Sequence, residues 1–392
     1  MSDTPPPPIE PRRRRRLPHS PASAEPRGFE GVRLTITEAQ DALTAAADRI
    51  AAPRSLWSRA PFDILAVSGG AAGGAFGAGL LVGLSRAGRR PTFAIVTGVS
   101  TGALIAPFAF LGSEWDERLS DAYTGGHAAR LLSRKAIPGL GGLLRADALD
   151  GLIAPFVDEA LLLAVAAAHA EGRRLFVATT DLDRQQACIW DMGAIASRAR
   201  PGDSDAPLKL FRDILAASAS LPGLFPPRMI ASRADGEDFE EMHVDGGVAA
   251  PLFILPEALL RDRNIGRRFR GGRVRVIVNT VLDPAPKSTP MNLPSILMRS
   301  FDTMLRFSYR QAISVAATFC AGAGVPLEIA SIPYDPNHGS MVKFDTESMQ
   351  RMFDSAVQSV MDGKAWVTAT PEPETLSGMF AKSFRPGKPA PV

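Results

Sequence analysis

The sequence of 392 residues contains only two cysteines, Cys188 and Cys320. They lie in the apolar segments QACIWDM and AATFCAG and do not show the C-x-x-C spacing of metal or redox sites. A disulfide scaffold needs several paired cysteines, so this class of protein is excluded. We expect two buried free thiols and no metal site.

Long apolar runs and a secretory leader are also missing. No uninterrupted apolar run reaches the roughly eighteen residues that a transmembrane helix needs. The N-terminus carries arginines but no apolar segment after them, unlike a signal peptide. The sequence therefore predicts a cytoplasmic protein without a transmembrane helix, and it leaves peripheral contact with a membrane open.

Little net charge remains outside the N-terminal segment. The formal net charge is +3, and Arg12 to Arg16 form one contiguous block. Because residues 1–30 combine this block with the run Pro5 to Pro8 and few large apolar groups, we expect a disordered arm. The arm is either a solubilising leader or a polybasic patch for an anionic membrane or for nucleic acid. The nearly neutral remainder gives no reason to expect nucleic acid as a partner.

Short apolar runs alternate with amphipathic segments from about residue 32. This alternation is typical of an α/β protein with three layers, α/β/α, around a mainly parallel central sheet. The expected strands are 62–67, 92–97, 174–180, 187–191, 241–244 and 273–279. The expected helices are 35–51, 75–87, 100–111, 147–171, 208–219, 292–319 and 346–362.

We expect a single domain over residues 31–368, followed by a proline-rich tail at 369–392. The motifs that contain the candidate functional residues fall within 60–280, and C-terminal helices follow in 290–365. Loops rich in glycine, proline and charge are expected at 124–145, 198–207, 232–240 and 281–290. The stretch 112–145 is either a mobile cover over a site or an ordinary surface excursion.

A glycine-rich turn, SGGAAGGAFGAG at residues 68–79, follows the first of these strands. A phosphate loop would need GxxxxGK[ST], and no GK[ST] occurs in the chain. A dinucleotide site would need GxGxxG and an acidic residue after the next strand, which is followed instead by TGVS. The remaining chemistry is an oxyanion hole, in which Gly69 and Gly70 expose backbone N–H groups to a developing negative charge.

The next strand leads into GVSTG, which places Ser100 at the centre of a GxSxG pattern. Small residues around it, Gly98, Thr101 and Gly102, permit the tight turn that lifts a serine hydroxyl above the sheet at a helix N-terminus. Ser100 is therefore the candidate nucleophile. The alternative is that both glycine-rich turns only allow close packing.

A serine nucleophile needs a base within hydrogen-bond reach. Of the five histidines, His19, His127 and His169 lie in segments without a site pattern. His338, in YDPNHGS, can follow Ser and Asp in the chain order of an α/β-hydrolase triad, which makes it one alternative.

The other candidate base is Asp245 in the segment MHVDGG. Gly246 and Gly247 let the backbone turn sharply and bring the carboxylate to the end of a strand. His243 shares its face if this segment is a strand, and we expect it to orient a neighbour or to pack.

A glycine loop, GVSTG and a DGG about 145 residues further on together resemble the patatin-like phospholipases, serine lipid acyl hydrolases with a Ser–Asp dyad. The likeness covers roughly residues 60–280 and includes LFRDILAASASLPGLFPP, from Leu210. The resemblance implies that Ser100 is the nucleophile and Asp245 the base. It also implies an oxyanion hole built from the backbone of six consecutive residues, Gly69, Gly70, Ala71, Ala72, Gly73 and Gly74.

Two positions of the loop depart from the family pattern GGGxRG. Ala71 stands where the third glycine is usual, and Gly73 stands where the arginine is usual. If position 71 needs a positive φ, an alanine there costs on the order of 1 kcal/mol. Without the arginine, backbone dipoles alone have to stabilise the oxyanion.

The sequence thus predicts a serine acyl ester hydrolase for lipids or lipid-like esters, acting as a phospholipase, lysophospholipase or acylesterase without a cofactor. Because a free aspartate has a pKa of about 3.9, the site has to be dry enough to raise it. Transfer of the acyl group to an acceptor other than water would use the same residues. The alternative from another class is a non-catalytic lipid-binding or scaffold protein that retains the fold.

Overall fold

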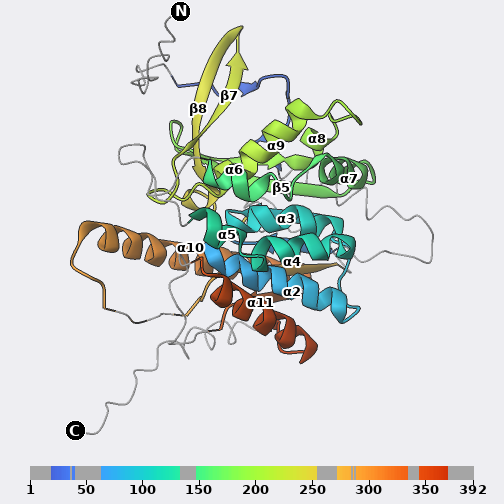
Figure 1. Cartoon of the computed structure of the whole chain (residues 1–392), viewed down its shortest axis with the longest axis vertical. Helices are drawn as coiled ribbons and strands as arrows, with labels where there is room; N and C mark the ends of the chain where they lie inside the picture. The colour runs from blue at the N-terminus through green and yellow to red at the C-terminus, as the bar shows by residue number, and fades with distance from the viewer. Residues whose placement is uncertain are drawn as a thin grey trace, which may run out of the picture.

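The computed structural model describes residues 19–35, 38–39, 63–132, 147–253, 272–283, 286, 288–333 and 344–369. They form a three-layer α/β/α fold around one mixed sheet, as expected (Figure 1). The strand order is β1-β7-β8-β5-β4-β3-β9-β10-β11, and β6 pairs with β5 and β2. The fold class predicted from the sequence is therefore confirmed.

The centre of the sheet is parallel. Its five strands are β5 (Arg174–Asp181), β4 (Ile95–Val99), β3 (Asp63–Val67), β9 (Arg273–Val278) and β10 (Leu327–Ser331). Strands that are covered on both faces are nearly continuous apolar runs, which is why β3, β5 and β9 match the expected ranges closely. The remaining strands pair antiparallel: β1 (Glu25–Pro26), β2 (Arg33–Leu34), β6 (Gln186–Asp191), β7 (Arg228–Ala234), β8 (Glu237–Asp245) and β11 (Val367–Ala369).

Two apolar layers lie on opposite faces of this sheet, because alternate residues of each strand point to opposite sides. Leu65 and Val67 belong to the larger layer, whereas Ile64 and Ala66 belong to the smaller one. Residues of α10 (Leu293–Ala323) pack into the smaller layer. The larger layer is covered by α2 (Gly74–Arg86), α3 (Thr101–Leu111), α4 (Asp116–Thr124), α6 (Ala148–Ile153), α7 (Glu159–Ala170), α8 (Met192–Ala196), α9 (Asp205–Ser218) and α11 (Thr346–Met361).

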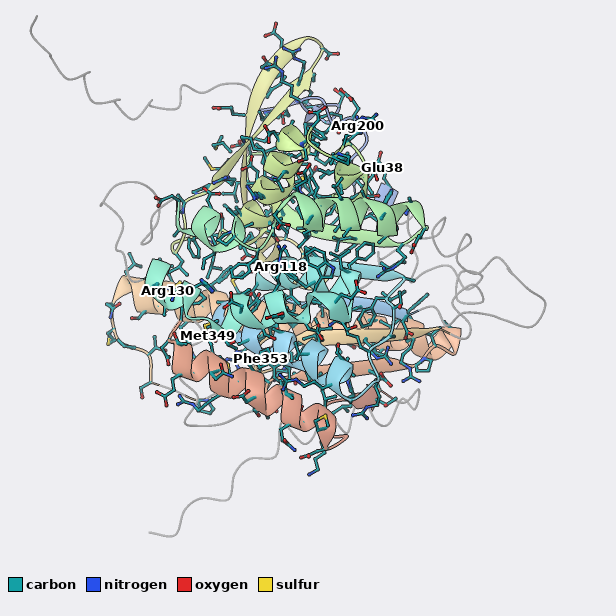
Figure 2. The ribbon with its side chains drawn as sticks, turned by 45° about the vertical axis from the view of Figure 1, so that its right-hand side comes forward. Glu38, Arg118, Arg130, Arg200, Met349 and Phe353 are labelled. Atoms are coloured by element: carbon teal, nitrogen blue, oxygen red, sulfur yellow. The ribbon has the colours of Figure 1, made fainter. Side chains whose placement is uncertain are left out.

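Helices α2 and α11 pack at close range, and glycines of α2 make this possible. A Cβ atom at Gly79 would lie 2.3 Å from the carbonyl oxygen of Phe353, and one at Gly83 would lie 3.1 Å from the Cα of Val357. Met349 and Phe353, which are labelled in Figure 2, are buried residues of α11. The later glycines of the rich stretch therefore serve helix packing.

Several elements differ from the sequence expectation. The single helix expected at 147–171 is two helices, α6 and α7, because Pro155 lies between them and the carboxylate of Asp158 accepts the N–H of Leu161 to begin α7. The loop expected at 232–240 is a hairpin between β7 and β8 that turns at Asp235 and Gly236, both with positive φ. Part of the expected cover at 112–145 is helical, in α4 and α5 (His127–Leu132).

The described structure includes part of the segment that was expected to be a disordered arm. Residues 19–30 were assigned to the disordered arm, yet β1 pairs with β7 and Ala24 is fully buried. The average composition of the arm conceals this, because most of its prolines and arginines precede residue 19, whereas Ala24, Phe29 and Val32 after them are buried. This part of the arm prediction is wrong, and Arg12 to Arg16 lie outside the described residues.

Three other expectations fall outside the described residues. They concern most of the helix expected at 35–51, His338 and the tail beyond Ala369. Within the described part of the chain, every helix is too short or too polar to cross a bilayer.

Candidate active site

Ser100 and Asp245 come together because two strands end against each other along one edge of β5. Strand β4 runs parallel to β5 and ends at Val99, opposite Ala178. Strand β8 runs antiparallel to β5 and ends at Asp245, opposite Thr179. The other edge of β5 is occupied by β6 over the same residues. Since Ala178 and Thr179 are consecutive, the residue that follows β4 and the last residue of β8 are neighbours in space.

Ser100 sits in a sharp turn between β4 and α3. Its φ of 58° and ψ of −128° lie in a region that residues with a side chain rarely occupy. Its N–H donates to the Ser218 hydroxyl at 2.9 Å, and that hydroxyl donates to the carbonyl of Ala178 at 2.7 Å. Ser218 of α9 therefore ties the turn to β5 and holds the unusual backbone geometry.

The glycines around this turn are required by close backbone approach. A Cβ at Gly98 would lie 2.5 Å from the carbonyl oxygen of Gly102, and a Cβ at Gly102 would lie 2.3 Å from that of Val67. Thr101 donates its hydroxyl to Tyr123, whose own hydroxyl donates to the Thr101 carbonyl at 3.1 Å. Tyr123 of α4 thus braces the first turn of α3, and no local pattern in the sequence marks it.

Asp245 is buried, with 2% of its surface exposed. Its Oδ1 accepts the N–H of Gly247 at 2.7 Å, while Oδ2 has no hydrogen-bond partner of normal geometry among the described residues. Burial raises the pKa of Asp245 to about 6, and contacts from the Ser100 hydroxyl and the Gly247 N–H limit the rise. The carboxylate is therefore a stronger base than a free aspartate while it faces Ser100.

The loop that carries Asp245 is held in place from β5. The Thr180 hydroxyl donates to the Asp245 carbonyl at 2.9 Å and accepts the N–H of Ala249 at 3.2 Å. A Cβ at Gly246 would lie 2.2 Å from the Ala178 carbonyl oxygen, which explains the glycine directly after the aspartate.

Gly69, Gly70 and Ala71 line the same pocket as Ser100 and Asp245. Gly70 has a φ of 151°, and a Cβ there would lie 1.9 Å from the carbonyl oxygen of Asn279. A Cβ at Gly69 would lie 2.9 Å from the Cβ of Ser100. The two glycines therefore let the loop pass directly over the serine.

The rest of the loop turns away into a helix. Ala71 has a φ of 50°, the positive value that makes alanine costly at this position. The Gly73 N–H donates to the Gly70 carbonyl at 2.9 Å, and the Gly74 N–H donates to the Ala71 carbonyl. Ala72 is buried and does not line the pocket. The N–H groups of Gly73 and Gly74 are thus engaged within the helical turn.

A second tyrosine, Tyr309 of α10, reaches the site from the other face of the sheet. Its side chain is buried, and its hydroxyl oxygen would lie 3.2 Å from a Cβ at Gly69. Burial and the nearby charge of Asp245 raise the pKa of Tyr309, while a hydrogen bond to Ser68 opposes the rise. The hydroxyl therefore remains a proton-bearing donor beside the glycine loop.

Apolar side chains form most of the pocket wall. They come from α3, α6, the segment after α9, α10 and the segment before α11: Leu104, Leu149, Leu152, Leu221, Leu224, Phe225, Met298, Phe301, Leu305 and Phe344. The charged groups at the pocket are Asp245, Asp302 and Arg306, and Arg306 Nε lies 3.2 Å from Asp302 Oδ2. Such a wall suits a long apolar ligand with one polar end.

No histidine is among the described residues that line the pocket. His127 contacts Asp121 at 3.1 Å, and His169 contacts Asp191 at 3.6 Å. His243 is fully buried, and its Nδ1 lies 3.0 Å from the Thr179 hydroxyl. The expectation that His243 orients a neighbour or packs agrees with this contact.

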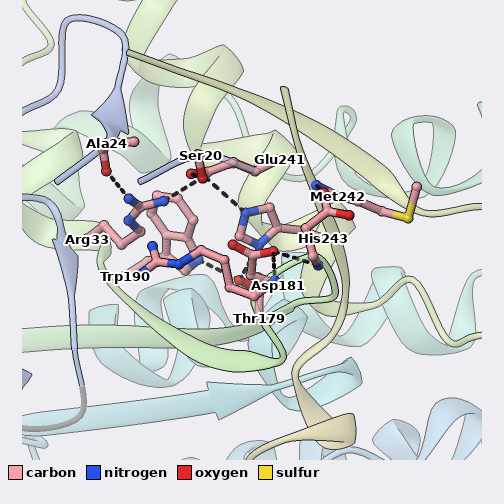
Figure 3. Close-up of polar contacts among 11 residues, drawn as sticks. Ser20, Ala24, Arg33, Thr179, Asp181, Trp190, Glu241, Met242 and His243 are labelled. Atoms are coloured by element: carbon pink, nitrogen blue, oxygen red, sulfur yellow. Dashed lines mark hydrogen bonds and ion pairs between the residues drawn. The ribbon is translucent and has the colours of Figure 1, made fainter. Parts of the chain in front are cut away.

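His243 belongs to a buried polar cluster beside the pocket (Figure 3). Glu241 in this cluster binds the guanidinium of Arg33 and the hydroxyl of Ser20, and its Oε2 lies 3.5 Å from His243 Nε2. Despite its burial, these partners lower the pKa of Glu241 to about 2. Asp181, Glu241 and His243 are near enough to one another to form a metal-ligand set, but Arg33 and Ser20 already use the oxygens of Glu241.

Fold and site together define an α/β/α protein with a serine and an aspartate in an apolar pocket at the carboxyl ends of parallel strands. Residues 65–257 match the model of the family described as Patatin-like phospholipase. This segment is therefore a patatin-like phospholipase domain.

The solved structures that resemble the chain include the two that follow. VipD from Legionella pneumophila is 13% identical, with a TM-score of 0.35, over 79% of this chain and 68% of that one. Human GIVD cytosolic phospholipase A2 is 12% identical, with a TM-score of 0.27, over 77% of this chain and 50% of that one. The chain thus spans half of the length of the human enzyme. A search of the curated proteins finds no match.

Proposed function

We propose that the protein is a serine lipid acyl hydrolase in which Ser100 is the nucleophile and Asp245 is the general base. One observation carries the proposal: β4 and β8 end on consecutive residues of β5, so that a serine with positive φ faces a buried carboxylate inside an apolar pocket. The match to this family supports lipid acyl hydrolysis in general.

In the first half of the reaction, the Ser100 oxygen attacks the carbonyl carbon of the ester while its proton passes to Asp245 Oδ2. The carbonyl π electrons move to the oxygen, which becomes an oxyanion. When the tetrahedral intermediate collapses, Asp245 returns its proton to the departing alcohol and an acyl-Ser100 ester remains. A water molecule then attacks the carbonyl carbon of the acyl-Ser100 ester while Asp245 takes its proton. When this second intermediate collapses, the bond to the Ser100 oxygen breaks, Asp245 returns the proton to that oxygen, and the fatty acid is released.

Backbone N–H groups supply the stabilisation in this mechanism. We assign the oxyanion hole to the N–H groups of Gly70 and Ala71, because these residues line the pocket together with Ser100, and the positive end of α3 adds to the same region. This oxyanion hole is smaller than the one that the sequence suggested, because Gly73 and Gly74 donate within the helical turn. Negative charge moves from Asp245 to the substrate oxygen, so these two groups never carry a negative charge at the same time.

A fluorophosphonate probe tests the assignment, because it phosphonylates only an activated serine. We expect labelling of the native protein, loss of labelling in Ser100→Ala, and hydrolysis of a short-chain p-nitrophenyl ester that falls at least about a thousandfold in Ser100→Ala and Asp245→Asn. Ser197→Ala is the matched control, because the Ser197 hydroxyl donates to the Gly193 carbonyl in α8 and does not line the pocket, so this variant should retain labelling.

Two outcomes would contradict the proposal. A folded native protein that is neither labelled nor active favours the lipid-binding or scaffold alternative. Full activity in Asp245→Asn, together with loss of activity in His338→Ala, favours the triad alternative.

A further inference from the structure

The N-terminal half of α10 exposes large apolar side chains. Twelve large hydrophobic residues are exposed among the described residues, and six of them fall within residues 291–307. Half of these residues therefore lie in one short segment. Single exposed apolar residues need no explanation, but a group of them does. The exposed fractions run from 46% to 99% for Met291, Leu293, Ile296, Leu297, Met304 and Phe307.

These side chains follow one face of the helix. Four of them are spaced four, seven and three residues apart, which places them on one stripe along the helix: Leu293, Leu297, Met304 and Phe307. The positions that complete the stripe, Ser300 and Thr303, are exposed but uncharged. We call this surface the α10 stripe. It forms an apolar band without a charged residue.

Charged residues of the same segment are held beside the stripe. Asp302 contacts Arg299 at 3.4 Å and Arg306 at 3.2 Å, and Arg310 donates to the Leu282 carbonyl at 2.9 Å. Asp302 offsets only part of the positive charge of the three arginines, and none of these charged groups belongs to the stripe itself. An apolar band flanked by arginines on an amphipathic helix is typical of a helix that lies in a membrane interface.

The opposite side of the same helix forms the wall of the active-site pocket. Met298, Phe301, Leu305 and Tyr309 line that pocket together with Ser100. Helix α10 projects from the left side of the molecule in Figure 1, beyond the sheet and the other helices. The stripe and the pocket are thus two faces of one projecting helix.

We propose that the α10 stripe docks the enzyme on the surface of a lipid bilayer, so that the pocket receives its acyl chain directly from the membrane. The proposal rests on the proposed function, because a pocket for lipid esters needs its substrate delivered without passage of the acyl chain through water. The attraction is apolar, so a neutral lipid surface suffices and salt has little effect.

Vesicle binding tests the proposal without catalysis. Protein with Ser100→Ala is mixed with neutral phosphatidylcholine vesicles, and the bound fraction is measured by flotation at about 0.1 M and about 1 M NaCl. We expect binding at both salt concentrations. Adding Leu297→Ser and Phe307→Ser should weaken the partition at least about tenfold, because two large apolar side chains no longer leave water. Met361→Ser on α11 removes a similarly exposed side chain and should have no effect.

A fluorescent label gives a second measurement. Cys188 and Cys320 are both buried, so a cysteine introduced by Phe307→Cys is the accessible site for an environment-sensitive fluorophore. We expect its emission to shift to the blue when vesicles are added, and a label introduced by Met361→Cys should not respond. Circular dichroism confirms that each variant is folded.

Hydrolysis of a monomeric soluble ester separates this proposal from the proposed function. With Ser100 intact, the double variant at Leu297 and Phe307 should keep this activity within about twofold while it loses activity on vesicles. If the enzyme is active and the stripe variant binds vesicles as well as the parent does, the docking proposal is overturned and the proposed function is not. An inactive protein that still binds vesicles through the stripe overturns the proposed function alone.

Two further outcomes also overturn the docking proposal. Binding that disappears at high salt and after removal of residues 1–18 assigns membrane contact to Arg12 to Arg16. A dimer in solution that dissociates in the stripe variant, without vesicle binding by the parent, assigns the stripe to a contact between copies of the chain.

Discussion

Asp245 is the residue whose chemistry governs the pH response. Its pKa of about 6 reflects burial beside Ser100, and only the carboxylate form can accept a proton from the serine. We expect kcat/KM on a soluble ester to rise about tenfold per unit of pH up to about 6 and then to level off. Steady-state kinetics between pH 4.5 and 8.5 measure this profile, with circular dichroism at each pH as a check on folding. A rate that is flat across pH 6 would argue against an aspartate base.

The same burial predicts a cost in stability. The folded-state pKa of Asp245 is raised, so the folded protein binds this proton more tightly than the unfolded chain, and the destabilisation is present above pH 6 and disappears as pH falls toward 4. We expect Asp245→Asn to raise the free energy of unfolding at pH 8 by about 1 to 3 kcal/mol, with little difference at pH 4. Urea unfolding at the two pH values measures it. An equal effect at both would mean that the charge is not responsible.

Ala71 carries backbone strain in the glycine loop. With a φ of 50°, it occupies a conformation that glycine adopts freely. We expect Ala71→Gly to raise the free energy of unfolding by up to about 1 kcal/mol, measured by thermal denaturation. Ala72→Gly is the control, because Ala72 is buried in the same turn without a positive φ, and it should lower stability. A loss of stability in both variants would show that the positive φ is not the source of strain.

At the scale of elements, the packing of α2 on α11 depends on Gly79. A Cβ there would lie 2.3 Å from a backbone oxygen, which cannot move aside as a flexible side chain can. We expect Gly79→Ala to lower the free energy of unfolding by about 1 to 3 kcal/mol in urea denaturation. Gly322 of α10 has open space around it, so Gly322→Ala should instead stabilise by about 0.5 to 1 kcal/mol. Equal effects of the two substitutions would contradict the packing argument.

The elements that could be predicted from the sequence are those whose pattern is local. β3 and β9 are short apolar runs, and Ser100 and Asp245 stand beside small residues that mark sharp turns. β7 was missed because exposed or half-buried positions alternate with buried ones along it and include Arg228 and Arg233, which resemble a charged loop.

The supporting residues of the site could not be predicted in this way. Ser218, Tyr123 and Tyr309 are single polar residues in helices, and each contacts the site only after distant segments have packed together. The same holds for Asn279, whose carbonyl explains why position 70 is glycine. A local pattern identifies the groups proposed to react, whereas the groups that hold them depend on the tertiary fold.

At the scale of the whole molecule, the N-terminal segment is joined to β8 by a buried ion pair. Arg33 and Glu241 expose 7% and 1% of their side chains. Removing one partner leaves an uncompensated buried charge, so we expect Arg33→Leu to lower the free energy of unfolding by about 3 to 5 kcal/mol in urea denaturation. Arg33→Leu combined with Glu241→Leu should recover most of this loss. A double variant that is as unstable as the single one would show that packing, and not charge, is responsible.

Because β4 and β8 end next to each other along β5, this strand fixes the distance between the two residues of the site. A single peptide step along this strand sets the spacing between serine and aspartate, although about 145 residues of chain separate them. Insertions or deletions in the intervening surface segments leave that step unchanged. The surface segments between the two motifs can therefore vary, including those that form the pocket walls, provided that β5 and Ser218 of α9, which lie in the same interval, keep their places.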